Sequence, residues 1–67
     1  MRWIDTRERL PKIEQVYVIS ITKDTYTYKS VAFFEHDCWF YSIEGEKGNL
    51  ITDRVNGWVE DLSVYVR

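Results

Sequence analysis

The stretch from Val16 to Ile43 constrains the fold more than any other part of the chain, because it is rich in β-branched and aromatic residues. Two short polar interruptions, Lys23-Asp24-Thr25 and His36-Asp37, divide it into three runs of strand length. Polar breaks of this length between such runs are typical of β-hairpins. We therefore predict a three-stranded antiparallel meander. Its first strand is apolar on one face and half apolar on the other, as in the middle of a sheet.

A lead-in strand at Trp3 and Ile4 is predicted to precede the meander, followed by a brief helical turn. Asp5 and Glu8 have the spacing of a capping box, with Asp in place of the usual Ser or Thr. Pro11 disfavours helical geometry at the residue before it, so the turn should end there. Only one or two helical turns fit between these two signals.

The C-terminal third of the chain contains one loop signal and one hairpin signal. Residues 44–49 hold two glycines and three charges, which predicts a loop. Asn56-Gly57 stands between apolar residues, and this dipeptide favours a type I′ turn, in which both central residues have positive φ. We therefore predict strands at 50–55 and 58–60 around that turn, and a final strand at 62–66.

Together these segments predict a mainly β fold in a single domain, residues 1–67. We expect a small antiparallel sheet of four or five strands that can curl toward a barrel, with a short N-terminal helical turn. A chain this short buries only about 60% of the surface of its unfolded form, so its 45% hydrophobic content must supply the core. The single cysteine, Cys38, cannot close an internal disulfide. The predicted core is Trp3, Val18, Ile19, Ile21, Phe33, Trp39, Ile43, Val55, Trp58 and Val64.

Charge and hydropathy indicate no strong attraction to nucleic acid or to a membrane. The formal net charge is −2, and the apolar runs are far shorter than the ~20 residues that span a bilayer. The N-terminal residues are charged and contain no apolar leader segment. We therefore expect a cytoplasmic protein with no membrane attachment, and nucleic acid is disfavoured as a partner.

The residues Trp3-Ile4 and Arg9-Leu10-Pro11 resemble a family of short phage and prophage proteins of unknown function, whose members open with Trp-Ile-x-x-x-x-Arg-Leu-Pro. The resemblance extends over most of the chain. Its further matches are Val16-Tyr17-Val18, Val31-Ala32-Phe33-Phe34 with Trp39 soon after, and the closing Val-x-x-Trp element Val55-Asn56-Gly57-Trp58.

This resemblance implies a phage, prophage or host-acquired accessory gene, and it supplies neither an activity nor functional residues. The chain departs from the family in having Gly57 where a histidine often stands, and in continuing with Val59-Glu60-Asp61-Leu62 instead of a Met-Pro-Leu-Pro type tail. The family pattern treats Val-x-x-Trp as one continuous piece, whereas the Asn-Gly signal divides it. We favour the turn.

No catalytic, cofactor-binding or metal-binding constellation is found in the sequence. His36-Asp37-Cys38 offers three metal-capable side chains, but adjacent residues in a turn point apart and no second cluster would complete a site. A Cys38–His36 nucleophile pair lacks an oxyanion motif and an orienting third group. The carboxylate pairs are interpreted as exposed turn charges, and we expect no enzyme. These pairs are Glu44 with Glu46, Glu60 with Asp61, and Glu35 with Asp37.

Aromatic side chains are the stronger candidates for a binding surface. Tyr26, Tyr28, Phe33 and Tyr41 would suit base stacking if they shared a sheet face, although only Lys29 lies near them in sequence. Core packing and cross-strand aromatic pairing account for the same residues. The local cluster of Arg7, Arg9 and Lys12 beside Trp3 suits a phosphate or an acidic partner surface, or simply a structural contact by Arg9.

Two functions from different classes follow from this pattern. The first is a phage-type accessory protein that binds one protein partner or forms a homo-oligomer. The second is weak single-stranded nucleic-acid binding through an aromatic sheet face. The residues predicted to contribute to the interaction surface are Trp3, Arg7, Arg9, Tyr26 and Tyr28.

Overall fold

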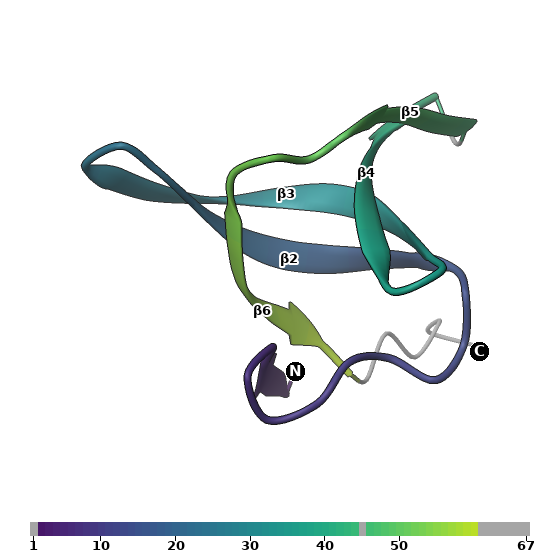
Figure 1. The fold of residues 1–67 in the computed structure, drawn as a ribbon, viewed down its shortest axis with the longest axis horizontal. Helices are drawn as coiled ribbons and strands as arrows, with labels where there is room; N and C mark the ends of the chain where they lie inside the picture. Colours follow the sequence, from purple (N-terminus) through teal and green to yellow (C-terminus); the bar gives the residue numbers. More distant parts are fainter. Residues whose placement is uncertain (1, 45, 61–67) are drawn as a thin grey trace, which may run out of the picture.

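The computed structural model of the chain describes residues 2–44 and 46–60, which form one six-stranded antiparallel sheet (Figure 1). The strands are β1 (Trp3–Asp5), β2 (Val16–Lys23), β3 (Tyr26–Glu35), β4 (Cys38–Ile43), β5 (Glu46–Leu50) and β6 (Arg54–Val59). Their order in the sheet is β1-β6-β2-β3-β4-β5. Within the described residues the edge strands β1 and β5 do not pair with each other, so the sheet stays open. None of these residues forms a helix long and apolar enough to cross a membrane.

The predicted meander is confirmed, and a crossover extends it. Strands β2, β3 and β4 pair in sequence, and β5 continues the series along β4. The chain then returns across the molecule, and β6 pairs with β2 on one side and with β1 on the other. As a result, β6 lies beside the N-terminal strand in Figure 1.

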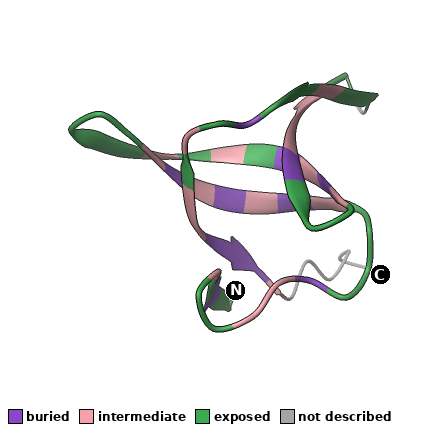
Figure 2. Cartoon of the chain, in the orientation of Figure 1, coloured by how far each residue is buried: buried purple, intermediate pink, exposed green. Residues whose placement is uncertain are grey.

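Alternation along the strands gives the sheet two unlike faces. In β2 the odd residues Tyr17, Ile19 and Ile21 are buried and the even residues are half-buried, an alternation visible in Figure 2. The register pairs Tyr17 with Ala32 and Val18 with Val31, which places each pair on one side of the sheet. We call the face that carries Tyr17 the inner face, and the face that carries Val18 the outer face.

An aromatic group on the inner face forms the centre of the core. The ring of Tyr17 lies edge-on between two indoles, with its centroid 6.1 Å from that of Trp39 and 5.3 Å from that of Trp58. Its hydroxyl donates to the backbone oxygen of Ile13 at 2.8 Å, and the indole N–H of Trp58 donates to the backbone oxygen of Arg9 at 3.0 Å. These two hydrogen bonds attach the irregular segment 6–15 to the sheet.

An ion pair across the outer face supports the edge strand β5. The ammonium of Lys47 lies 2.6 Å from a carboxylate oxygen of Glu35 in β3, and 4.8 Å above the ring of Phe40 in the intervening strand β4. The interaction with Lys47 lowers the pKa of Glu35. Lys47 therefore bridges three strands and covers part of an apolar ring.

The prediction of a turn at Asn56-Gly57 is wrong, because both residues lie inside β6. Gly57 has no positive φ, and a Cβ built on it would lie 2.9 Å from the backbone oxygen of Ile4. Glycine is needed here because β1 approaches β6 closely. The two-residue turn between β3 and β4 is instead made by His36 and Asp37, both with positive φ.

Two further predictions about local structure are corrected. The N-terminal helical turn is not seen: Asp5 belongs to β1, and a single hydrogen-bonded turn follows it, with Glu8 N–H donating to the Asp5 backbone oxygen at 2.9 Å. The segment before Pro11 is too short to offset the cost of nucleating a helix. Residues 44–49 do not form a simple loop, since β5 occupies 46–50 and the connection to β6 follows at 51–53.

The core prediction holds for the central strands and fails near their ends. Ile19, Ile21, Trp39 and Trp58 are buried as predicted, whereas Trp3 on the outer side of edge strand β1 is 42% exposed and Ile43 at the end of β4 is 58% exposed. Val18, Phe33 and Val55 are half-buried, and Val64, like the predicted strand 62–66, lies outside the described residues. Buried apolar residues absent from the prediction are Ile4, Tyr17, Ala32, Phe34, Ile51 and Val59.

Gly57→Ala is expected to destabilise the protein by about 1–3 kcal/mol, because the added methyl group must displace the backbone of β1. Denaturant unfolding measures the loss. Thr52→Ala, at an exposed position in the β5–β6 connection, serves as the control and should change the free energy of unfolding by less than about 0.5 kcal/mol. A neutral Gly57→Ala would contradict the close approach of β1 to β6.

Candidate binding site on the inner face

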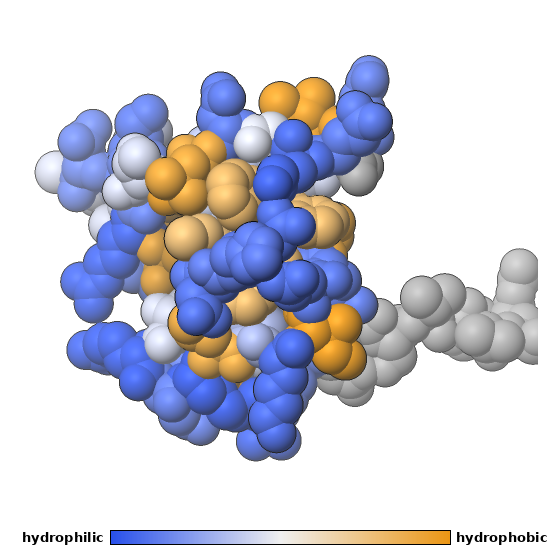
Figure 3. All heavy atoms as spheres, turned by 45° about the vertical axis from the view of Figure 1, so that its right-hand side comes forward, coloured by the Kyte–Doolittle hydropathy of each residue, from blue (hydrophilic) through white to orange (hydrophobic). Residues whose placement is uncertain are grey.

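Large apolar side chains reach the surface at separate points, as Figure 3 shows for one side of the molecule. Among the described residues the strongly exposed ones are Trp3, Ile13, Tyr26, Val31, Ile43 and Leu50. Three hollows adjoin these points. The smallest, about 240 Å³, includes Val18 and Val31 of the outer face. Another, of about 410 Å³, has the ion pair of Arg9 and Glu60 in its wall, so opposite charges there offset each other.

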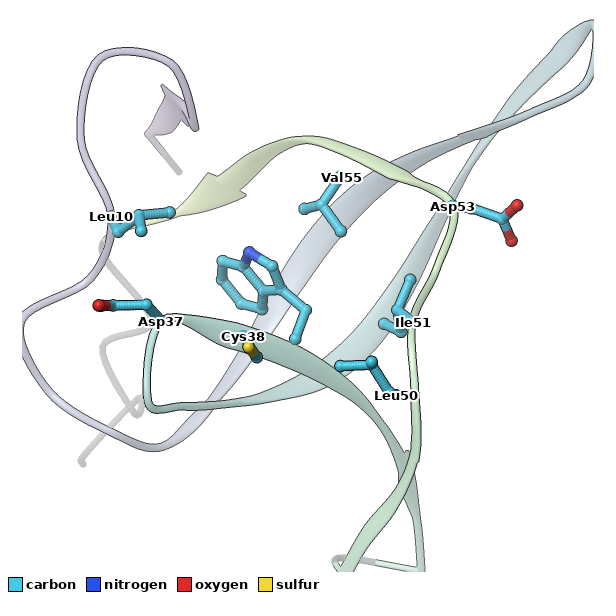
Figure 4. A pocket seen from close by; sticks show the side chains of 8 residues that line it. Leu10, Asp37, Cys38, Leu50, Ile51, Asp53 and Val55 are labelled. Atoms are coloured by element: carbon cyan, nitrogen blue, oxygen red, sulfur yellow. The ribbon is translucent and has the colours of Figure 1, made fainter.

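The third hollow, of about 390 Å³, lies against the aromatic core and is called here the inner-face hollow (Figure 4). Its floor contains Trp39 and Ile51, which are both buried core residues, and Leu10 and Val55, which pack against that core. Leu50, at 51% exposed, adds apolar surface at the rim. Side chains from the N-terminal segment, β4 and the β5–β6 connection thus meet around one depression.

A carboxylate stands at each end of this hollow. Asp37 comes from the β3–β4 turn and Asp53 from the connection before β6, and Figure 4 shows them on opposite sides of the apolar floor with both carboxylates turned outward. Neither forms an ion pair with another described residue. The site therefore combines an apolar centre with two separated negative charges.

Two tyrosines extend the site along the inner face. Interaction with the Tyr41 hydroxyl raises the pKa of Tyr28, and desolvation and the negative charge of Asp53 raise it further. Tyr28 and Tyr41 both pack against the core cluster. The charge of Asp53 therefore acts on the inner face of β3 as well as on the hollow.

The basic residues predicted for the interaction surface are engaged in structural ion pairs. The guanidinium of Arg7 lies 3.0 Å from a carboxylate oxygen of Asp5 and lowers the pKa of that carboxyl. Arg9 pairs with Glu60 at 2.5 Å and lies 5.4 Å above the ring of Trp58. The structural contact anticipated for Arg9 is thus present.

The aromatic residues predicted for that surface lie on separate parts of the sheet. Trp3 is in edge strand β1 on the outer face, whereas Tyr26 and Tyr28 begin β3 on the inner face, with ring centroids 5.8 Å apart. Strands β6 and β2 separate the two groups in the sheet order. Phe33, which was also considered for base stacking, lies an odd number of residues from Tyr28 along β3 and therefore belongs to the outer face.

The turn His36-Asp37-Cys38 does not bring its three side chains together. The backbone N–H of His36 donates to a carboxylate oxygen of Glu14 at 2.8 Å, and Cys38 is exposed. In the described part of the chain, no three His, Cys, Asp or Glu side chains are grouped so as to hold a metal ion.

Sequence reasoning missed most of the inner-face hollow. Leu10 and Val55 lie far apart in the chain and meet only because β6 returns across β2, which no local pattern indicates. Asp53 falls within the strand predicted at 50–55, and nothing in its local sequence marks it as a site residue. The signal that could have pointed to the site was Trp39, which lies in both the aromatic run and the resemblance motif.

Comparison with known proteins found no matching family model, no matching curated protein and no matching solved structure.

Tyr41→Phe is expected to lower the pKa of Tyr28 toward its ordinary value of 10.0, because the variant removes the hydroxyl that contributes most to the shift. A raised tyrosine pKa stabilises the fold below the unfolded pKa, and this contribution is lost as the pH rises through the folded value. NMR titration of the tyrosine Cζ resonances measures the shift.

Asp53→Asn should lower the same pKa by less, whereas Asp24→Asn, in the β2–β3 turn, should leave it unchanged. An unaltered Tyr28 titration in Tyr41→Phe would show that the two side chains are not in contact.

Proposed function

We propose that this domain is a protein-interaction module that binds a partner protein through the inner-face hollow. The main support is the hollow itself: about 390 Å³ of apolar depression, open to solvent, directly over the aromatic core. This volume lies within the usual range of ligand sites, and an exposed rim leucine gives a partner apolar surface to bury.

The opening motif of the chain supports a phage or prophage setting for this module. The pattern Trp3-Ile4 followed by Arg9-Leu10-Pro11 is the part that resembles short phage and prophage proteins. Leu10 belongs to that motif and also lines the hollow. We therefore propose a cytoplasmic accessory protein that acts by binding one protein.

A separate protein partner has more support than self-association through strand pairing. Edge strand β1 has three residues, and edge strand β5 carries Glu46 and Lys47 beside Gly48. Short and charged edge strands disfavour pairing with another copy.

Single-stranded nucleic-acid binding has less support. Stacking platforms require several aromatic rings on one face with basic groups that follow the phosphates. Here Phe33 lies on the opposite face from Tyr28. Tyr28 itself is close enough to the negative charge of Asp53 for that charge to raise its pKa, and a carboxylate would repel a phosphate.

Site-directed photo-crosslinking tests the proposal, because the only cysteine in the sequence lines the hollow and is exposed. Protein labelled at Cys38 with a benzophenone maleimide is expected to crosslink one partner from a phage-bearing bacterial lysate. Leu50→Ser in the same labelled protein should reduce the yield at least about fivefold, as expected when an interface apolar anchor is removed.

The matched control is the double variant Val31→Cys/Cys38→Ser, which carries the same label at a position that is 46% exposed and does not line the hollow. It should give no crosslink to that partner. Equal crosslinking from the two label positions, or a yield unaffected by Leu50→Ser, would contradict binding through the hollow.

A further inference from the structure

The charges around the inner-face hollow indicate the charge and polarity of the partner that it binds. The floor, formed by Leu10, Trp39, Ile51 and Val55, offers mainly apolar and aromatic surface to an occupant. Asp37 and Asp53 stand at its two opposite ends (Figure 4). An occupant that runs from one end of the hollow to the other therefore meets a negative charge at each end.

Three carboxylates of the described residues lie in ion pairs with arginine or lysine, whereas the two aspartates that line the hollow do not. Arg2 and Arg9 contact Glu60, Arg7 contacts Asp5, and Lys47 contacts Glu35. Asp37 and Asp53 have no such partner among residues 2–44 and 46–60. Electrostatic complementarity to the hollow is thus satisfied by a cationic partner.

We propose that the hollow binds an extended segment of a partner protein in which one apolar side chain is flanked by two arginines or lysines. This inference rests on the proposed function and names the chemistry of the partner. The apolar side chain packs on the floor between Leu10 and Val55, and the basic side chains reach Asp37 and Asp53.

The geometry of an extended chain sets the spacing of such a segment. Residues two apart along a strand point to the same side and are separated by about 7 Å. An apolar residue with basic residues two positions before and two positions after it presents all three side chains to the hollow. Arginine fits better than lysine because its planar guanidinium can make two hydrogen bonds to one carboxylate.

Four blocked heptapeptides test the inference by isothermal titration calorimetry at low salt. The reference is Gly-Arg-Gly-Leu-Gly-Arg-Gly; the others replace both arginines by glutamine, both by glutamate, or the leucine by alanine. The arginine–leucine peptide should bind at least about tenfold more tightly than the glutamine peptide, and this advantage should shrink in 0.5 M salt. The glutamate peptide should be the weakest, and the alanine peptide should also bind less tightly than the reference.

Variants of the protein assign the effect to the two carboxylates. Asp37→Asn with Asp53→Asn should reduce the affinity for the arginine–leucine peptide to that for the glutamine peptide. Asn tolerates the positive φ of position 37, so the turn is retained. The matched control is Asp24→Asn, which removes the same charge from a positive-φ turn position outside the hollow and should leave binding unchanged.

The outcomes separate this inference from the proposed function. Equal binding of the arginine and glutamine peptides, with both weakened by Leu50→Ser, would overturn the cationic partner and leave the hollow as a protein-binding site. Absence of binding by all four peptides, together with crosslinking unaffected by Leu50→Ser, would overturn both. A homodimer that Leu50→Ser abolishes and the arginine–leucine peptide fails to dissociate would assign the hollow to a second copy of the chain.

Discussion

The edge-on packing of Tyr17 between Trp39 and Trp58 is the interaction on which the rest of this structure depends. Such contacts contribute about 0.5–1.5 kcal/mol each beyond the burial of their area, and here they join β2 to β4 and to β6 across an open sheet. The polar ends of Tyr17 and Trp58 are hydrogen-bonded to the backbone of the segment between β1 and β2. One aromatic group therefore holds β6 against β2 and fixes the N-terminal segment that carries Leu10.

The strands that were predictable are those whose burial follows from local alternation. The runs at 16–23, 26–35 and 38–43 are rich in β-forming residues, and their pairing required only short turns. The failures at Gly57 and at the hollow share one cause, which is contact between segments far apart in the chain. Gly57 was assigned to a turn because its local signal is strong, yet its actual constraint is the backbone of β1. The hollow was unpredictable for the same reason, because its walls come together only through the crossover.

The turn between β3 and β4 shows how this chain combines local strain with an exposed charge. His36 and Asp37 both have positive φ, a conformation that glycine adopts at lower cost. Backbone strain of this kind persists only where the surrounding structure over-determines it, and here the backbone of His36 is bonded to Glu14 while β3 and β4 pair on either side. The result is an aspartate held at the end of an apolar hollow.

The three tryptophans lie in three separate parts of the structure. One measurement can therefore test directly whether a partner binds in the inner-face hollow. Trp39 lies in the floor of the hollow, Trp58 anchors the N-terminal segment and Trp3 is exposed on the outer side of β1. Fluorine NMR of 5-fluorotryptophan-labelled protein, recorded during titration with the arginine–leucine peptide, follows all three at once. We expect a saturable shift of the Trp39 resonance, with those of Trp3 and Trp58 nearly unchanged. A shift confined to Trp3 would place binding on the outer face and contradict binding in the inner-face hollow.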